Sequence, residues 1–212
     1  MAFGSVAAAA STTANAERRL DPVDEAAQDT GLLKYLERLK SIIARRDMTA
    51  LLAQMDPVFR VDFDGGKGPT AFAHRWNPTA PDSAVWKVLD RLFGLGGTFY
   101  TPTLFAISYV YTKFPFDLDP YSYVVVTRDQ APLRPEPSAD ATPIAALQTG
   151  IVAVKPKLTP PVRELPAWLK IGVPDGPEGF VASTDVYSPA GYRVFFEKRG
   201  GKWRWISLVC AD

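Results

Sequence analysis

The sequence predicts an α+β protein with a small β-barrel in its second half. Three features indicate this. Residues 32–43 carry apolar side chains at helical spacing, residues 124–181 contain short apolar runs separated by proline and glycine, and residues 191–209 form a hairpin around a glycine turn. Short strands between such turns are typical of a small barrel, whereas the helical stripe needs a sheet or further helices to cover it.

The composition is that of a globular protein without a strong charge bias. The 212 residues suffice for one large domain or two small ones, and 47% of them are hydrophobic. The 24 basic and 23 acidic residues give a net charge of +1, which argues against a nucleic-acid-binding protein. Most of the 19 prolines lie between periodic segments, which favours a loop-rich β protein over a helical bundle.

The first half of the chain predicts helices and a few strands. The apolar stripe of the first helix consists of Leu32, Leu33, Leu36, Leu39, Ile42 and Ile43. Thr30 or Asp29 can cap this helix, and Asp47 can cap a second short one that ends before Pro57. A strand is expected at 58–63, followed by a short helix around Phe72–Trp76 and a further helix that Ser83 can cap. Residues 98–116 are expected to be extended.

The second half resembles a bacterial SH3 domain over residues 121–187. The resemblance rests on the order of its motifs: Val124-Val125-Val126-Thr127, Leu133-Arg134-x-x-Pro137-Ser138, Pro143-Ile144-Ala145-x-Leu147, Gly150-Ile151-Val152-x-Val154, Trp168-Leu169-Lys170-Ile171 and Asp175-Gly176-x-x-Gly179-Phe180-Val181. It implies an SH3-like β-barrel of five or more short strands. The side chains expected to be buried are Val125, Leu133, Ile144, Leu147, Val154, Ile171 and Val181. The segment 155–166 departs from the family because it is longer and richer in proline.

The hairpin at the end of the chain resembles the closing hairpin of NTF2-like domains, in which a strand with Gly-Lys-Trp completes a curved sheet. Here Gly201-Lys202-Trp203 follows Gly200. Both faces of this hairpin are apolar, so we expect it to pair with strands at 58–63 and 98–112, with the barrel as an insertion. The predicted layout is a signal-like or disordered tail at 1–16, a linker at 17–30, an α+β region at 31–119 completed by 188–212, and the SH3-like barrel at 121–187.

The N-terminal residues leave the compartment open. Ala14-x-Ala16 matches a signal-peptidase site and precedes the charged residues 17–19, but residues 1–16 contain no Lys or Arg. These residues are therefore either a disordered tail or a signal peptide that lacks its basic start. We expect a periplasmic or secreted protein, with a cytoplasmic one as the alternative. No segment reaches the roughly 18 apolar residues of a transmembrane helix.

The reactive and metal-binding residue types form no recognisable site. Cys210 is the single cysteine, which excludes an intrachain disulfide and a thiolate-rich zinc site. It lies at the end of an apolar strand, so a catalytic pair with His74, the single histidine, is not expected. Asp62, Asp64, Asp117 and Asp119 lack the spacing of a calcium loop and are interpreted as turn residues. No cofactor, metal or enzymatic activity is expected.

Aromatic residues give the one positive signal for binding. Trp168, Phe180, Tyr187, Trp203 and Trp205 crowd the predicted barrel and hairpin, and they serve either core packing or recognition. We name Arg134, Glu136 and Trp168 as candidate ligand-binding residues.

The leading hypothesis is a non-catalytic, exported binding module for cell-wall material or a peptide. One alternative is a structural accessory or assembly protein without a ligand. The other is an NTF2-like enzyme with a pocket in residues 58–116. The resemblance to bacterial SH3 domain-containing proteins carries no activity over to this chain.

Overall fold

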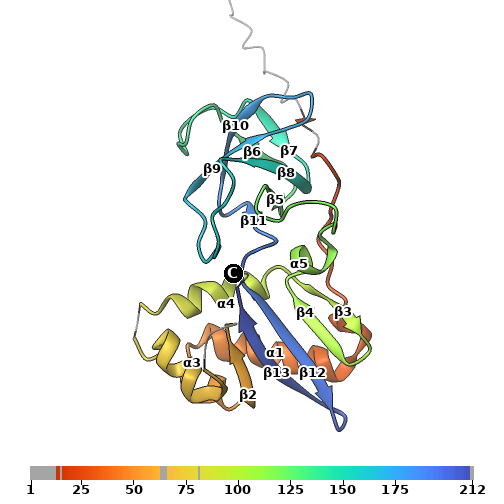
Figure 1. The fold of residues 1–212 in the computed structure, drawn as a ribbon, viewed down its shortest axis with the longest axis vertical. Helices are drawn as coiled ribbons and strands as arrows, with labels where there is room; N and C mark the ends of the chain where they lie inside the picture. The colour runs from red at the N-terminus through yellow and green to blue at the C-terminus, as the bar shows by residue number, and fades with distance from the viewer. Residues whose placement is uncertain (1–12, 15, 63–65, 81, 211–212) are drawn as a thin grey trace, which may run out of the picture.

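The protein has two lobes stacked along its long axis (Figure 1). The computed structural model describes residues 13, 14, 16–62, 66–80 and 82–210. One lobe combines helices with a five-stranded sheet, and the other consists of strands and loops. The last strands of the chain return to the helical lobe, beside its early strand β2 (Figure 1).

The described helices all belong to the first lobe. They are η1 (Ala26–Gln28), α1 (Thr30–Ala44), α2 (Met48–Leu52), α3 (Gly68–Trp76), α4 (Ala84–Phe93) and α5 (Tyr109–Lys113). The carboxylate of Asp29 caps α1 by accepting from the Leu32 amide at 2.9 Å, and Asp47 caps α2 in the same way through the Ala50 amide. None of the described helices has the length and apolar character that crossing a bilayer requires.

The sheet of the first lobe has the order β2-β13-β12-β4-β3. Its strands are β2 (Met55–Val61), β3 (Gly97–Thr101), β4 (Leu104–Ile107), β12 (Arg193–Arg199) and β13 (Lys202–Val209). The terminal hairpin lies at its centre, since β13 pairs with β2 in parallel and β12 pairs with β4 antiparallel. Gly200 and Gly201 form the hairpin turn at φ values of 53° and 76°, which glycine adopts without steric cost.

Aromatic side chains fill the core between this sheet and the helices. The Trp205 ring lies 5.2 Å from Phe59 and 6.0 Å from Phe72, both in edge-to-face geometry. All three side chains are fully buried, and such pairs contribute about 0.5–1.5 kcal/mol each beyond the area that they bury. The hairpin therefore supplies the centre of the core as well as the centre of the sheet.

The second lobe contains two sheets and an aliphatic core. Its strands are β1 (Thr13–Ala14), β5 (Tyr123–Val126), β6 (Ala131–Leu133), β7 (Ala145–Leu147), β8 (Gly150–Lys155), β9 (Trp168–Gly172), β10 (Glu178–Ala182) and β11 (Val186–Tyr187). The larger sheet has the order β10-β9-β8-β5-β11, and the smaller one has the order β1-β7-β6.

The prediction of a closed SH3-like barrel at 121–187 is wrong. The strands form open sheets, and β6 meets β10 only through one bridge, in which the backbones of Arg134 and Phe180 exchange hydrogen bonds of 2.9 and 2.7 Å. No further ladder pair between β6 and β10 is described beyond this bridge, so the two sheets are not joined into a barrel there. The protein is an α+β structure with open sheets.

One of the seven side chains of residues 121–187 that are expected to be buried is exposed. Ile144 is 40% exposed, whereas Ala145 and Leu147 are buried. The Ile144 amide donates to the Leu133 carbonyl at 2.8 Å, just before β7 begins. With Ala145 and Leu147 facing inward, the alternation along the strand leaves Ile144 at the surface.

Candidate functional site

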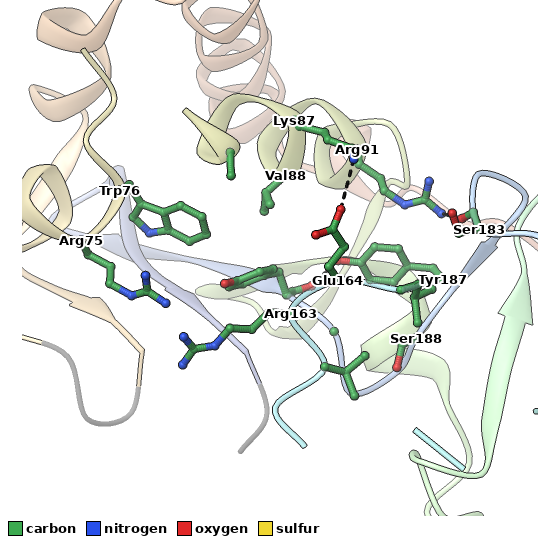
Figure 2. A pocket seen from close by; sticks show the side chains of 15 residues that line it. Arg75, Trp76, Lys87, Val88, Arg91, Arg163, Glu164, Ser183, Tyr187 and Ser188 are labelled. Carbon is green, nitrogen blue, oxygen red and sulfur yellow. Dashed lines mark hydrogen bonds and ion pairs between the residues drawn. The ribbon is translucent and has the colours of Figure 1, made fainter. Parts of the chain in front are cut away.

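A cleft of about 340 Å³ lies where the two lobes meet. The first lobe contributes the end of α3 and one side of α4, and the second contributes the loop around Val162–Leu165 and the turn before β11. Figure 2 shows the side chains that converge on this space. Clefts of this kind between lobes are common places for small ligands to bind.

One side of the cleft is aromatic and aliphatic. The Trp76 and Tyr192 rings lie 5.3 Å apart, and Val88 and Leu165 also line the cleft. The buried hydroxyl of Tyr187 donates to the carbonyl of Tyr192 at 2.7 Å, which fixes the backbone there. Burial raises the pKa of Tyr192 to about 12, so its phenol is neutral at physiological pH. This side therefore offers apolar contact area without a charge.

Arg91 joins the two lobes beside the cleft. Its guanidinium, on α4, donates to the carbonyl oxygens of Ser183 and Val186, and it lies 5.5 Å from the centre of the Tyr187 ring. Burial lowers the pKa of Arg91 from its ordinary value, yet an arginine stays charged at any physiological pH. Because its donors serve the two carbonyls, Arg91 acts as a structural clamp.

Lys87 and Glu164 form an ion pair at the rim, with 3.3 Å between Nζ and Oε1 (Figure 2). Their side chains are 83% and 80% exposed. Pairs at such exposure contribute about 0–1 kcal/mol and break easily.

Two further arginines share one carboxylate at the other end of the cleft. Asp62 Oδ2 lies 3.9 Å from Arg75 Nε and 3.5 Å from Arg163 Nη2. The other oxygen of Asp62 accepts from the Cys210 amide at 3.1 Å, so this carboxylate is held by the end of β13. Arg75 comes from α3 and Arg163 from the second lobe, and their guanidinium groups lie on the same side of the cleft, below Trp76 (Figure 2).

The described lining of the cleft contains no acid–base pair. Its carboxylate, Glu164, is exposed and paired with Lys87, and neither histidine nor cysteine is among the lining residues. His74 is exposed on α3, and the Cys210 thiol is buried and donates to the Val162 carbonyl at 3.3 Å. Across the described ranges, no group of three His, Cys, Asp or Glu side chains could hold a metal ion.

The aspartates considered for calcium have other partners. Asp119 accepts from Ser122 at 2.6 Å and from Lys157 at 2.9 Å, and these bonds lower its pKa to about 2. Asp117 pairs with Arg18. Asp64 lies outside the described residues.

The candidate residues Arg134, Glu136 and Trp168 lie in the second lobe, away from the cleft lining. Arg134 donates to the Ala141 carbonyl and so braces its own loop. Glu136 is exposed in that loop, and Trp168 is half-buried at the start of β9. No hydrogen bond, ion pair or ring contact is described among the three side chains.

Few features of the sequence indicate which residues line the cleft. Arg163 belongs to the proline-rich segment 155–166, whose unusual length was visible. Trp76 and Tyr192 are aromatic residues near predicted element ends, and Tyr187 belonged to the aromatic set considered for recognition. Nothing local distinguished Arg75 from other surface arginines, because its partners are distant in the sequence.

Comparisons with known proteins show no family. No protein-family model matches the sequence, and no curated protein matches it. A solved structure named "Putative Scytalone Dehydratase", from Novosphingobium aromaticivorans, matches with 10% identity and a TM-score of 0.30, over 86% of this chain and 82% of that one. So low a score supports no argument about fold or activity. The assignment to the bacterial SH3 family is wrong, because no family model matches and the strands of residues 121–187 form open sheets. The hairpin's resemblance to NTF2-like domains gains no support from a family model.

Proposed function

We propose that this protein is a non-catalytic binding protein, and that the cleft between its lobes holds a small ligand with an apolar body and a polar end. The observation that carries the proposal is the lining. It combines a wall of Trp76, Val88, Leu165 and Tyr192 with the basic residues Arg75 and Arg163 at one end. Pockets for small ligands commonly join a mostly apolar wall to a few convergent polar groups.

The size of the cleft limits the ligand. A volume of about 340 Å³ is at the lower end of the range of about 300–1,000 Å³ that is typical of small-molecule sites. It suits a small molecule or the end of a short peptide, including a peptide branch of cell-wall material. The cleft replaces Arg134, Glu136 and Trp168 as the proposed binding site.

The side chains that line the cleft support the proposal that the protein binds its ligand without catalysing a reaction. General acid–base catalysis needs a proton donor or acceptor within hydrogen-bond reach and with a pKa near the working pH. Tyr192 has a pKa of about 12, and Glu164 lies at the exposed rim. These groups suit contact with a ligand better than proton transfer.

Binding to simple aromatic probes tests the proposal. We would use 1-naphthaleneacetate, N-acetylphenylalanine and the amide of each, and follow binding by ligand-observed NMR. Val88→Trp should abolish binding of every probe because its indole fills the cleft. Val58→Trp is the matched control, since Val58 is 59% exposed on β2 and outside the lining.

Three results would contradict the proposal. They are no binding of any probe, binding that Val88→Trp leaves intact, and conversion of a bound probe during prolonged incubation. The first would favour a structural accessory without a ligand. A pull-down on purified peptidoglycan, with Val88→Trp as the comparison, then tests whether cell-wall material is the source of the ligand.

A further inference from the structure

The basic side chains at the cleft differ in whether their N–H groups donate hydrogen bonds to other residues of the protein. Arg91 donates to two backbone carbonyls, and Lys87 pairs with Glu164. For Arg75 and Arg163, by contrast, no side-chain hydrogen bond to any described residue is found. Each guanidinium has five N–H donors in a planar fork. The side chains of Arg75 and Arg163 are 39% and 43% exposed, so their donors face water and are available to a ligand.

Asp62 brings these two guanidinium groups together without saturating either one. Charge-assisted hydrogen bonds are about 2.7–2.9 Å long. The Asp62 distances of 3.5 and 3.9 Å are longer, so Asp62 orients the arginines while their forks stay open. One carboxylate also leaves a local charge of about +1, since two guanidinium groups face it. The arrangement has room for a second carboxylate.

The side chains next to the two arginines indicate the chemistry of the ligand beyond its carboxylate. The Arg75 guanidinium lies 5.5 Å from the centre of the Trp76 ring, and Trp76 in turn lies beside Tyr192. A carboxylate at the two arginines would therefore place the adjoining part of the ligand against aromatic rings. An acid with an aromatic or aliphatic group a few bonds from its carboxylate fits this pattern.

We infer that Arg75 and Arg163 form the carboxylate subsite of the cleft, one arginine from each lobe, and that the ligand is an apolar organic acid. The inference rests on the proposed function and adds the chemical class and its recognition residues. The acid can be a free small molecule or the carboxyl terminus of a peptide, since the two share this chemistry. Arginine suits the task because its fork binds a carboxylate through two parallel hydrogen bonds.

Each acid and its amide have the same apolar body and differ in charge. We expect the protein to bind 1-naphthaleneacetate or N-acetylphenylalanine at least tenfold more tightly than the corresponding amide, as measured by titration calorimetry. Preference for N-acetylphenylalanine would identify a peptide carboxyl terminus, and preference for 1-naphthaleneacetate a free acid. Either preference supports the carboxylate subsite.

Variants of the two arginines assign the subsite to them. Arg75→Met and Arg163→Met should each weaken binding of the acid at least tenfold and change binding of the amide less than twofold. Lysine at either position should restore part of the loss, because it keeps the charge and loses the fork. Arg38→Met is the matched control, since Arg38 is exposed on α1. Circular dichroism and the melting temperature show that each variant is folded.

The outcomes separate this inference from the proposed function. Equal affinity for acid and amide, or acid binding that both methionine variants leave unchanged, would overturn the carboxylate subsite while the binding function stands. Failure of both acid and amide to bind would overturn the proposed function itself. A fall in amide affinity equal to that of the acid would show that the arginines only support the shape of the cleft.

Discussion

The guanidinium of Arg91 donates to the carbonyl oxygen of Ser183 at 2.5 Å, across 92 positions of sequence. The same group reaches the carbonyl of Val186, so one side chain of α4 holds both ends of the turn that leads into β11. This contact lies beside the cleft and connects the helical lobe to the strand lobe. It explains how two segments distant in sequence keep a fixed spacing at the proposed site.

Replacing Arg91 should therefore destabilise the protein. Arg91→Met leaves two partly buried carbonyl groups without their donor, and losing one partner of a buried hydrogen bond costs about 1–3 kcal/mol. We expect the free energy of unfolding in urea to fall by about that amount. Arg38→Met, on the exposed face of α1, should stay within about 0.5 kcal/mol of the wild type. Equal stability of Arg91→Met and the wild type would show that the contact does not hold the lobes.

Two tryptophans should differ sharply when replaced by alanine. Trp205 is fully buried against Phe59 and Phe72, so Trp205→Ala should cost about 3–5 kcal/mol. Trp168 is half-buried at the start of β9, and Trp168→Ala should cost about 1 kcal/mol or less. Urea denaturation measures both. Trp168→Ala should also leave binding of the probes unchanged. A loss of binding would contradict the cleft as the binding site and support a site at Trp168.

The carboxylate of Asp29 should make the protein sensitive to acid. The ammonium of Lys198, at 2.7 Å, and then the Leu32 amide lower the pKa of Asp29 from 3.8 to about 2. A lowered pKa means that the folded state favours the charged carboxylate. This contribution is present above about pH 4 and is lost as the pH falls from 4 toward 2.

A pH series with Asp29→Asn isolates this contribution. Asparagine still accepts from the Leu32 amide, but it has no charge for Lys198. The variant should be less stable than the wild type at pH 7, and the difference between their urea midpoints should shrink steadily as the pH falls from 4 to 2. Asp140→Asn, in the exposed loop before β7, is the control. A difference that stays constant between pH 7 and pH 2 would contradict the assignment.

Processing after Ala16 remains a prediction that rests on the Ala14-x-Ala16 pattern. Mass spectrometry of the protein from its native cells should find an N-terminus at or near Glu17. Such cleavage would remove β1 and keep the Glu17 nitrogen, which donates to the Ile151 carbonyl at 2.8 Å. An intact Met1 or Ala2 terminus would refute export and favour a cytoplasmic protein.

Helix α1 shows what local sequence can predict. Its stripe of Leu32, Leu36, Leu39 and Ile43 is buried, and Asp29 caps its start. Spacing and capping are interactions within one or two helical turns, so the residues that decide them are neighbours in the sequence. The short strands of the second lobe follow from the same kind of local pattern.

Closure of the strands and formation of the cleft depend on distant segments. The run of motifs indicated strands but could not show that the ladder stops at the single bridge between Arg134 and Phe180. Asp62 meets Arg75 and Arg163 only because the chain folds α3 and a loop of the second lobe onto the end of β2.

The sequence by itself thus determined the helices with their caps, the short strands and the glycine turn of the hairpin, because each depends on residues a few positions apart. The tertiary structure alone decided that the sheets stay open and that two arginines share one carboxylate between the lobes. Such contacts form through space between surfaces that the whole chain must first place.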